Sequence, residues 1–189
     1  MGPARSRRQR PGRGGAGQLV RVSRQTAFQD AGRLRVHHID PIGHTVILRI
    51  DHIGLATEDP EGVAAFMTTL GMRKYDEGHA DDYGVACEFW QFGGGLGNPA
   101  VEIVSPTQQR SAIGGRLERQ GPGLYHLAFE VDDLESETSR LRSQGFTAID
   151  AEPCKGAREG MTVAFLYAPA PANLLLELVH YAPDLGRDM

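Results

Sequence analysis

Short runs in which hydrophobic and polar residues alternate follow one another from residue 49 onward, and the pattern occurs twice. The segment RIDHIGLATEDPEGVAAFMTTLGM at 49–72 aligns with LYHLAFEVDDLESETSRLRSQGF, which ends at Phe146. Each copy begins with an alternating stretch typical of a strand, passes through an acidic turn, and continues as an amphipathic helix that stops at Gly71 or Gly145. The chain is therefore predicted to contain an internal repeat.

Each half contains three further hydrophobic runs of strand length, so the repeating unit is predicted to be βαβββ. One such unit leaves an apolar face of its sheet uncovered, and the two copies are therefore expected to pack together. The predicted fold class is α+β, an incomplete eight-stranded barrel with a cleft between its two halves, built from modules 49–106 and 124–183 and a helical connector at 107–123. The later strands are expected at 72–76, 85–92, 100–105, 146–150, 161–167 and 174–180.

The first 48 residues differ from the rest in composition. Residues 1–35 contain nine arginines and a single acid, Asp30, and they lack apolar periodicity. We expect a disordered basic extension and linker over 1–48, because such a segment buries too little apolar surface to offset its ordering entropy. An Arg-rich, acid-poor start also resembles an organellar transit peptide, although a cytoplasmic protein is the favoured prediction.

The remainder of the chain is acidic, with eleven basic and 23 acidic residues at 36–189. This charge argues against nucleic acid as a partner. No apolar run approaches the roughly 18 residues that cross a bilayer, so a membrane protein is not expected. Cys87 and Cys154 lie far apart and form no CxxC pair, which favours free thiols over a disulfide or a thiolate zinc site.

Two histidines and two glutamates occupy matched places in the repeat. Glu102 follows His52 by 50 residues, and Glu177 follows His126 by 51. Strand alternation places both carboxylates on apolar faces, where an unpaired charge costs several kcal/mol, so each needs a cation, either an arginine or a metal ion. Histidines on the neighbouring strands favour a His2Glu2 site for one divalent ion.

Smaller features complete this picture of the cleft. Gly54 and Ala128 lie two residues beyond the histidines on the same face, and their small side chains are expected to leave room for a substrate. His79 and His180 have no counterpart in the other half and are expected at the surface.

These residues resemble the vicinal oxygen chelate superfamily, which includes the glyoxalases and the bleomycin-resistance proteins, and within it most closely the methylmalonyl-CoA epimerases. The resemblance covers 49–183. It is carried by IDHIGLAT, VEIVSP, SAIGGRLERQGPGLYHLAFEVDDLE, KGAREGMTVAFLYAP and LLLEL.

The resemblance implies an isomerase that epimerises a methylmalonyl-CoA-like acyl thioester by proton abstraction and an enolate intermediate. The implied ligands of the ion, which could be Co, Mn, Ni or Zn, are His52, Glu102, His126 and Glu177. Inversion needs an acid/base group on each face of the substrate, and Glu177 resembles one of them. Glu88 lies near the family's second base, although a structural role for it is an equal alternative.

Three departures from the family pattern concern the substrate. Tyr125 replaces a second histidine, Arg158 replaces the histidine of a GAHG-like turn, and Tyr167 begins a segment that replaces HPK. The last two lie where coenzyme A would approach, and there Lys155 and Arg158 are candidates to pair with its phosphates, with an exposed basic loop as the alternative.

Other functions in the same superfamily stay open at this point. They are a glyoxalase I-like isomerase, an isomerase or lyase of secondary metabolism, and a non-catalytic resistance protein that binds a small molecule. Metal analysis separates the last from the others, because such binders generally lack the full ligand set. Members of the superfamily often dimerise, and a homodimer is expected here.

Overall fold

The structure is a computed structural model that describes residues 47–93 and 98–182. The predicted basic extension therefore lies outside the described residues, except for Ile47 and Leu48. These two residues belong to the first strand, which begins slightly before the predicted boundary at 49. Residue 183, the predicted end of the second module, also lies outside.

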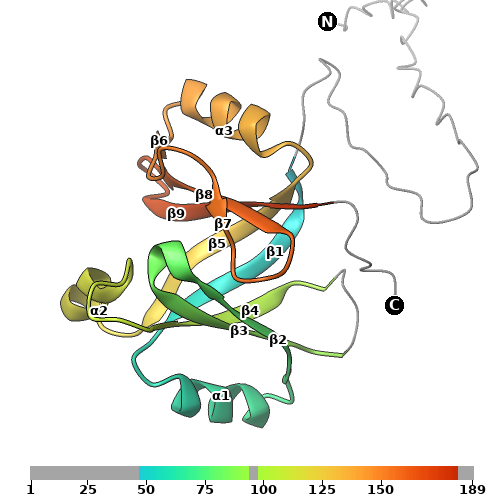
Figure 1. Cartoon of the computed structure of the whole chain (residues 1–189), viewed down its shortest axis with the longest axis vertical. Coiled ribbons are helices and arrows are strands. Elements are labelled where there is room, and N and C mark those ends of the chain that lie inside the picture. Colours follow the sequence, from blue (N-terminus) through green and yellow to red (C-terminus); the bar gives the residue numbers. More distant parts are fainter. Residues whose placement is uncertain (1–46, 94–97, 183–189) are drawn as a thin grey trace, which may run out of the picture. The chain divides into compact units, whose positions relative to one another are not determined.

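Two similar modules make up the described fold (Figure 1). The first comprises β1 (Ile47–Ala56), α1 (Pro60–Thr69), β2 (Arg73–Ala80), a 3-10 turn η1 (Asp81–Tyr83), β3 (Val85–Gln91) and β4 (Ala100–Pro106). The connector holds α2 (Gly114–Gln120). The second module comprises β5 (Gly123–Val131), α3 (Leu134–Ser143), β6 (Thr147–Ala148), β7 (Cys154–Lys155), β8 (Met161–Ala168) and β9 (Leu174–Tyr181). The predicted repeat is confirmed.

Both long helices begin and end as the sequence predicts. Asp59 and Asp133 cap α1 and α3, and each carboxylate accepts a hydrogen bond of 2.9 Å from the backbone N–H three residues later. Gly71 and Gly145 follow the helices with φ of 84° and 91°, a region that glycine enters without a steric penalty.

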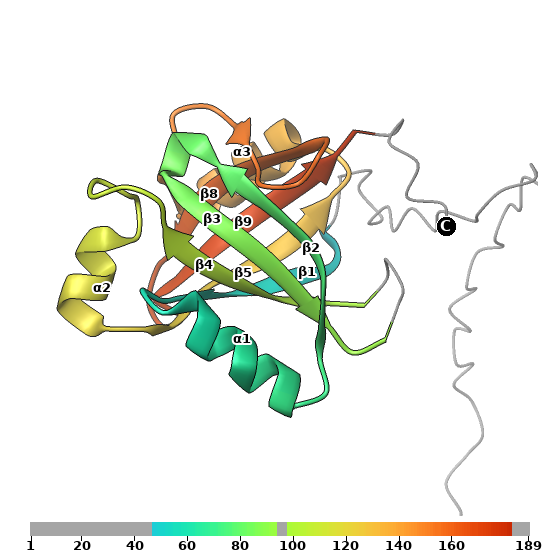
Figure 2. The same ribbon diagram turned by 60° about the horizontal axis from the view of Figure 1, so that its bottom comes forward.

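One sheet contains all the described strands, in the order β2-β3-β4-β1-β5-β9-β8-β6, with β7 paired to β8. The modules meet at the antiparallel pair β1·β5, while β1·β4 and β5·β9 are parallel. The sheet curves without closing, as predicted, and α1 and α3 lie far apart, one beside each module, in both views (Figures 1 and 2).

The strand count differs from the prediction, because the described residues form nine strands instead of eight. The run expected at 146–150 keeps only the two residues of β6. There the Asp150 carboxylate, instead of a backbone carbonyl, accepts the hydrogen bond from the Phe165 N–H at 2.7 Å, and this ends the ladder. Pro153, which has no N–H to donate, precedes the short extra strand β7.

The two faces of the sheet have different neighbours. On the outer face, Met67 of α1 packs in one cluster with Trp90 of β3, and Leu141 of α3 packs in another with Leu178 of β9. The inner, concave face carries a second set of apolar side chains around the centre of the sheet. Where a strand is regular, its side chains reach the inside from alternate positions. Among the described residues, no helix is long and apolar enough to cross a membrane.

Candidate metal centre

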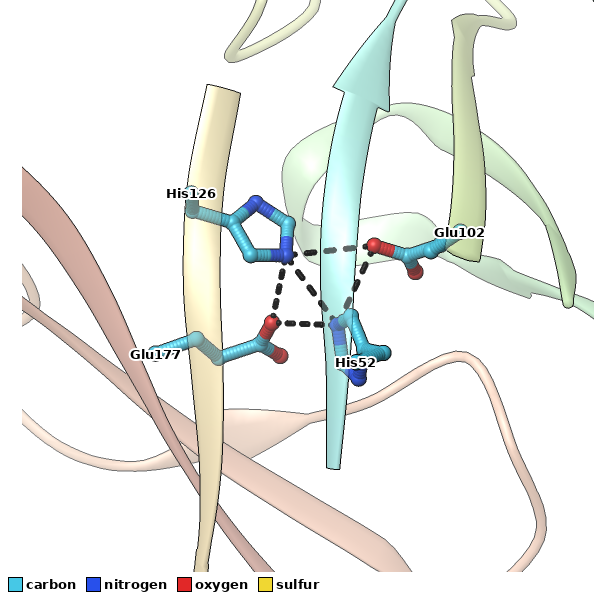
Figure 3. Close-up of side chains that lie close together, drawn as sticks. All are labelled: His52, Glu102, His126 and Glu177. Atoms are coloured by element: carbon cyan, nitrogen blue, oxygen red, sulfur yellow. Dashed lines mark hydrogen bonds and ion pairs between the residues drawn. The ribbon is translucent and has the colours of Figure 1, made fainter. Parts of the chain in front are cut away.

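The predicted ligands come from the four central strands, β4, β1, β5 and β9. Residues that lie opposite one another on adjacent strands form rows across the sheet. Two such rows each carry two predicted ligands with a small residue between them. One row holds Glu102, Gly54 and His126, and the other holds His52, Ala128 and Glu177. The internal repeat thus brings together four side chains that are up to 125 residues apart in the sequence (Figure 3).

The four side chains converge through one atom each. His52 Nε2 lies 3.0 Å from His126 Nε2, 3.0 Å from Glu177 Oε2 and 3.2 Å from Glu102 Oε2. His126 Nε2 lies 2.9 Å from Glu177 Oε2 and 3.2 Å from Glu102 Oε2. All four residues are buried, and none is more than 5% exposed.

This spacing fits a divalent metal ion. Imidazole nitrogen and carboxylate oxygen bind such ions at about 2.0–2.2 Å, so two ligands at a right angle are about 3.0 Å apart. Five of the six pairs of donor atoms have such a spacing, and all four lie within 4.8 Å of one another. The mixture of imidazole and carboxylate suits zinc, cobalt, nickel or manganese and does not choose among them.

The electrostatics of the cluster also favour a cation. Burial lowers the pKa of His52, but Glu102 and Glu177 outweigh it and raise that pKa well above 6.5. The pKa of His126 is raised for the same reasons. Burial raises the pKa values of both carboxyl groups, but the two histidines lower them below 4.5. The carboxylates are therefore ionised, and a bound ion would take the place of the protons on the imidazoles.

Gly54 makes room for a ligand, not for a substrate as predicted. A Cβ atom at this position would lie only 2.6 Å from both ring nitrogens of His126. The imidazole is further enclosed by Tyr125 and Phe165, whose rings meet it edge to face at 5.2 and 5.4 Å. Ala128, the corresponding residue beside His52, is fully buried.

A cavity of about 400 Å³ borders the cluster, and Glu102, His126 and Glu177 form part of its wall. Most of the remaining wall is apolar, with Val104, Ile113, Val163 and Phe165 among its side chains. A small acyl group could therefore lie beside an ion in surroundings that exclude most water.

The structure does not bring Glu88 to this cavity. Neighbouring residues of β3 alternate between faces, and Cys87 and Phe89 are the ones that point inward. The Glu88 carboxylate accepts a hydrogen bond from Trp90 Nε1 at 3.1 Å and lies 3.4 Å from Lys74 Nζ on the outer face. This placement corrects the expectation that Glu88 is the second base and favours the structural alternative.

The position of Arg158 also differs from the prediction that it lies beside coenzyme A. Its guanidinium carbon lies 3.6 Å from the centroid of the Phe89 ring, and its Nη1 donates to the Tyr181 hydroxyl at 2.8 Å. With only 6% of the residue exposed, Arg158 is part of the interior and not of an exposed basic loop. Lys155 is exposed on β7, between two residues that line the cavity, and phosphate binding stays a prediction for it.

One buried acid beside the cluster was not predicted. Asp51 Oδ2 lies 2.8 Å from His52 Nδ1, and Arg158 Nη1 lies 3.4 Å from the same oxygen. Burial raises the pKa of Asp51, but the hydrogen bond with His52 and the charges nearby lower it to about 2. Strand alternation assigns Asp51 to the outer face, so the pattern of hydrophobic positions gave no signal for it.

Several known proteins are similar to this chain in sequence. Residues 51–165 match the family model described as the glyoxalase/bleomycin resistance protein/dioxygenase superfamily. The chain is 30% identical over 135 residues to the ethylmalonyl-CoA/methylmalonyl-CoA epimerase of Cereibacter sphaeroides, which covers 70% of this chain and 98% of that protein. It is 29% identical over 132 residues to the mitochondrial methylmalonyl-CoA epimerase of Homo sapiens, covering 69% of this chain and 72% of that protein.

Solved structures of methylmalonyl-CoA epimerases are also similar to this chain. Methylmalonyl-CoA epimerase from Mycobacterium tuberculosis superposes with a TM-score of 0.66 at 28% identity, covering 75% of this chain and 93% of that one. A variant of the Streptomyces coelicolor methylmalonyl-CoA epimerase in complex with 2-nitronate-propionyl-CoA gives a TM-score of 0.65 at 28% identity, covering 72% of this chain and 99% of that one.

Proposed function

Because the chain belongs to the glyoxalase/bleomycin resistance protein/dioxygenase superfamily, we propose that it is a metal-dependent isomerase that epimerises a methylmalonyl-CoA-like thioester. The observation that carries this proposal is the convergence of His52, Glu102, His126 and Glu177 at the wall of a mostly apolar cavity. The two modules and their connector, residues 49–183, form the proposed catalytic unit.

The four converging side chains would hold the ion, and a bound ion would supply a Lewis acid for the oxygens of a substrate. The acidic proton of such a substrate lies on the carbon between a thioester carbonyl and a carboxylate. Glu177 takes this proton, because it is ionised and faces the cavity at the ligand cluster. The apolar wall keeps water away from the carbanion-like carbon while the negative charge develops.

Inversion requires a proton to return from the face opposite Glu177. Glu177 enters the cavity from β9 of the second module, whereas Cys87 enters it from β3 of the first. Burial, and then the charge of Glu102, raise the pKa of the Cys87 thiol well above 9.0, so this thiol holds its proton at neutral pH. We assign the second proton transfer to Cys87 in place of Glu88.

The remaining parts of the proposal follow from the relatives and from the resemblance. Relatives have been solved with acyl-CoA compounds, and we propose that the acyl group of a thioester enters the cavity while Lys155 contacts the phosphates of its carrier. A homodimer and a cytoplasmic location are also proposed.

The decisive experiment follows the α-proton of (2R)- and (2S)-methylmalonyl-CoA by NMR in deuterated water, with protein loaded with cobalt. We expect solvent deuterium to enter both compounds and the two to interconvert. His126→Ala, which removes one ligand, should abolish the exchange together with cobalt binding. If cobalt-loaded protein shows no exchange in either compound, the proposed epimerase activity is overturned. Activity on a hemithioacetal would then favour a glyoxalase I-like isomerase.

A further inference from the structure

We propose that Asp51 is a positioning residue of the metal centre, which holds the imidazole of His52 with Nε2 directed at the ion and is itself held by Arg158 and Tyr181 of the other module. The inference rests on the proposed metal centre. It assigns a role to a buried network that lies behind the ligands.

The local backbone explains why Asp51 points inward. In the pairing of β1 with β5, Ile50 lies opposite Phe129 and His52 lies opposite Ala128, so Asp51 is an extra residue on β1. Such a bulge breaks the alternation of faces and re-aims side chains. As a result two consecutive residues are buried, with Asp51 only 3% and His52 0% exposed.

The hydrogen bond between these neighbours fixes the state of the imidazole. An ionised carboxylate only accepts hydrogen bonds, so the bond of 2.8 Å from His52 Nδ1 to Asp51 Oδ2 requires a proton on Nδ1. In the neutral ring, Nε2 then carries the lone pair that a metal ion needs, and it is Nε2 that lies among the ligand atoms.

The second module holds the carboxylate of Asp51 in place. The Tyr181 hydroxyl donates to Oδ2 at 3.0 Å, and Arg158 Nη1 lies 3.4 Å from the same oxygen. Arg49 Nη2 lies 3.6 Å from Oδ1. Arg158 in turn covers the Phe89 ring, which meets the His52 ring edge to face at 5.5 Å. The carboxylate therefore has partners on the sides that His52 leaves open.

The other histidine shows that this arrangement is specific to one half of the repeat. Tyr125 occupies the place of Asp51 in the second module, and within the described residues the buried Nδ1 of His126 has no hydrogen-bond partner. Ring contacts and the space at Gly54 orient His126 instead. A change at Asp51 should therefore act on the ion through His52 alone.

Cobalt affinity of the full chain, measured by competition with a chelator, tests the proposal. Asp51→Asn should weaken cobalt binding by about 10- to 100-fold, the usual effect of losing the partner of a metal-bound histidine. Glu130→Gln is the matched control, because Glu130 also pairs with Arg49, with 2.7 Å between Glu130 Oε2 and Arg49 Nε, but does not contact His52. Its affinity should stay within about twofold of the wild type.

A second readout distinguishes positioning from a general loss of stability. In zinc-loaded protein labelled at histidine with nitrogen-15, the Nδ1 proton of His52 should give a downfield, slowly exchanging signal. Asp51→Asn should move this signal upfield and Glu130→Gln should leave it in place. If Asp51→Asn does not fold, Tyr181→Phe removes one bond to the same carboxylate and should shift the signal and weaken cobalt binding to a smaller extent.

The outcomes are separable from those of the proposed function. Unchanged cobalt affinity and an unchanged imidazole proton in the folded Asp51→Asn protein, or in Tyr181→Phe where only that variant folds, would overturn the inference while the metal centre stands. A wild-type protein that binds no cobalt would overturn the proposed function and this inference with it.

Discussion

Replacing Gly54 by alanine is the most direct perturbation of the proposed metal centre that avoids its ligands. The added Cβ would lie 2.6 Å from both ring nitrogens of His126, whereas ordinary contacts begin at 3.4 Å. The imidazole would therefore have to retreat by about 1 Å. Metal–ligand distances are held to about 0.2 Å, so a shift of this size removes His126 Nε2 from the coordination sphere.

The substitution is expected to lower the affinity for the metal ion strongly and the stability of the fold only modestly. We expect Gly54→Ala to weaken cobalt binding at least about 100-fold, which corresponds to about 2.7 kcal/mol, measured by competition titration. Overpacking should destabilise the metal-free protein by about 1–3 kcal/mol. Gly114→Ala is the control, because a Cβ there meets its nearest atom, Ser111 Oγ, at an ordinary 3.4 Å. A folded Gly54→Ala protein that binds cobalt within twofold of the wild type would refute the reasoning.

Three other predictions concern the chemistry and the charges of the site. Glu177→Gln should slow α-proton exchange at least about 100-fold, measured by NMR in deuterated water. Glu88→Gln should leave the exchange rate within about twofold of the wild type, because Glu88 bonds to Trp90 and Lys74 outside the cavity. A large loss of exchange in the Glu88 variant would contradict this placement. Cys87→Ala should slow exchange in one enantiomer more than in the other, and equal rates would remove Cys87 from the mechanism. Because the folded-state pKa values of the two cluster histidines are raised, their stabilising contribution is present below about pH 6.5 and is lost as the pH rises through those values. The melting temperature of chelator-treated protein should therefore fall above about pH 6.5, and a rise instead would contradict protonated histidines in the metal-free cluster.

The repeat made the four proposed ligands accessible to sequence reasoning. His52 and His126 are 74 residues apart, as are the glycines that end the two helices, so one alignment relates both the elements and the polar residues on them. Parallel pairing of the first and last strands of each module then brings each histidine near its own module's glutamate. The sequence does not predict that the modules pair side by side through β1 and β5, because any packing of their two apolar faces would satisfy the hydrophobic pattern.

The misplacement of Glu88 concerns the two faces of strand β3. The segment CEFWQF gives Cys87 and Phe89 one face and Glu88 the other, and the apolar character of both faces hides which of them is the inside. Trp90 packs with Met67 and Met72 on the outer face, and this contact decides the orientation of β3. Because the side chains of a strand alternate with a period of two, a shift of one residue exchanges Glu88 for Cys87 at the inner face.

Asp51 and Arg158 show a different limit, because they have no equivalent in the other copy of the repeat. Asp51 follows Ile50 without a glycine that would mark a bulge, and the bulge alone turns its carboxylate inward. Arg158 stands 107 residues away in a loop of polar composition, and its burial depends on Phe89 and Tyr181 meeting it from two different strands. An internal repeat therefore predicts what its copies share, which here is the set of proposed ligands. The residues that distinguish the copies depend on local register, and in this chain they include the network that orients only one of the two histidines.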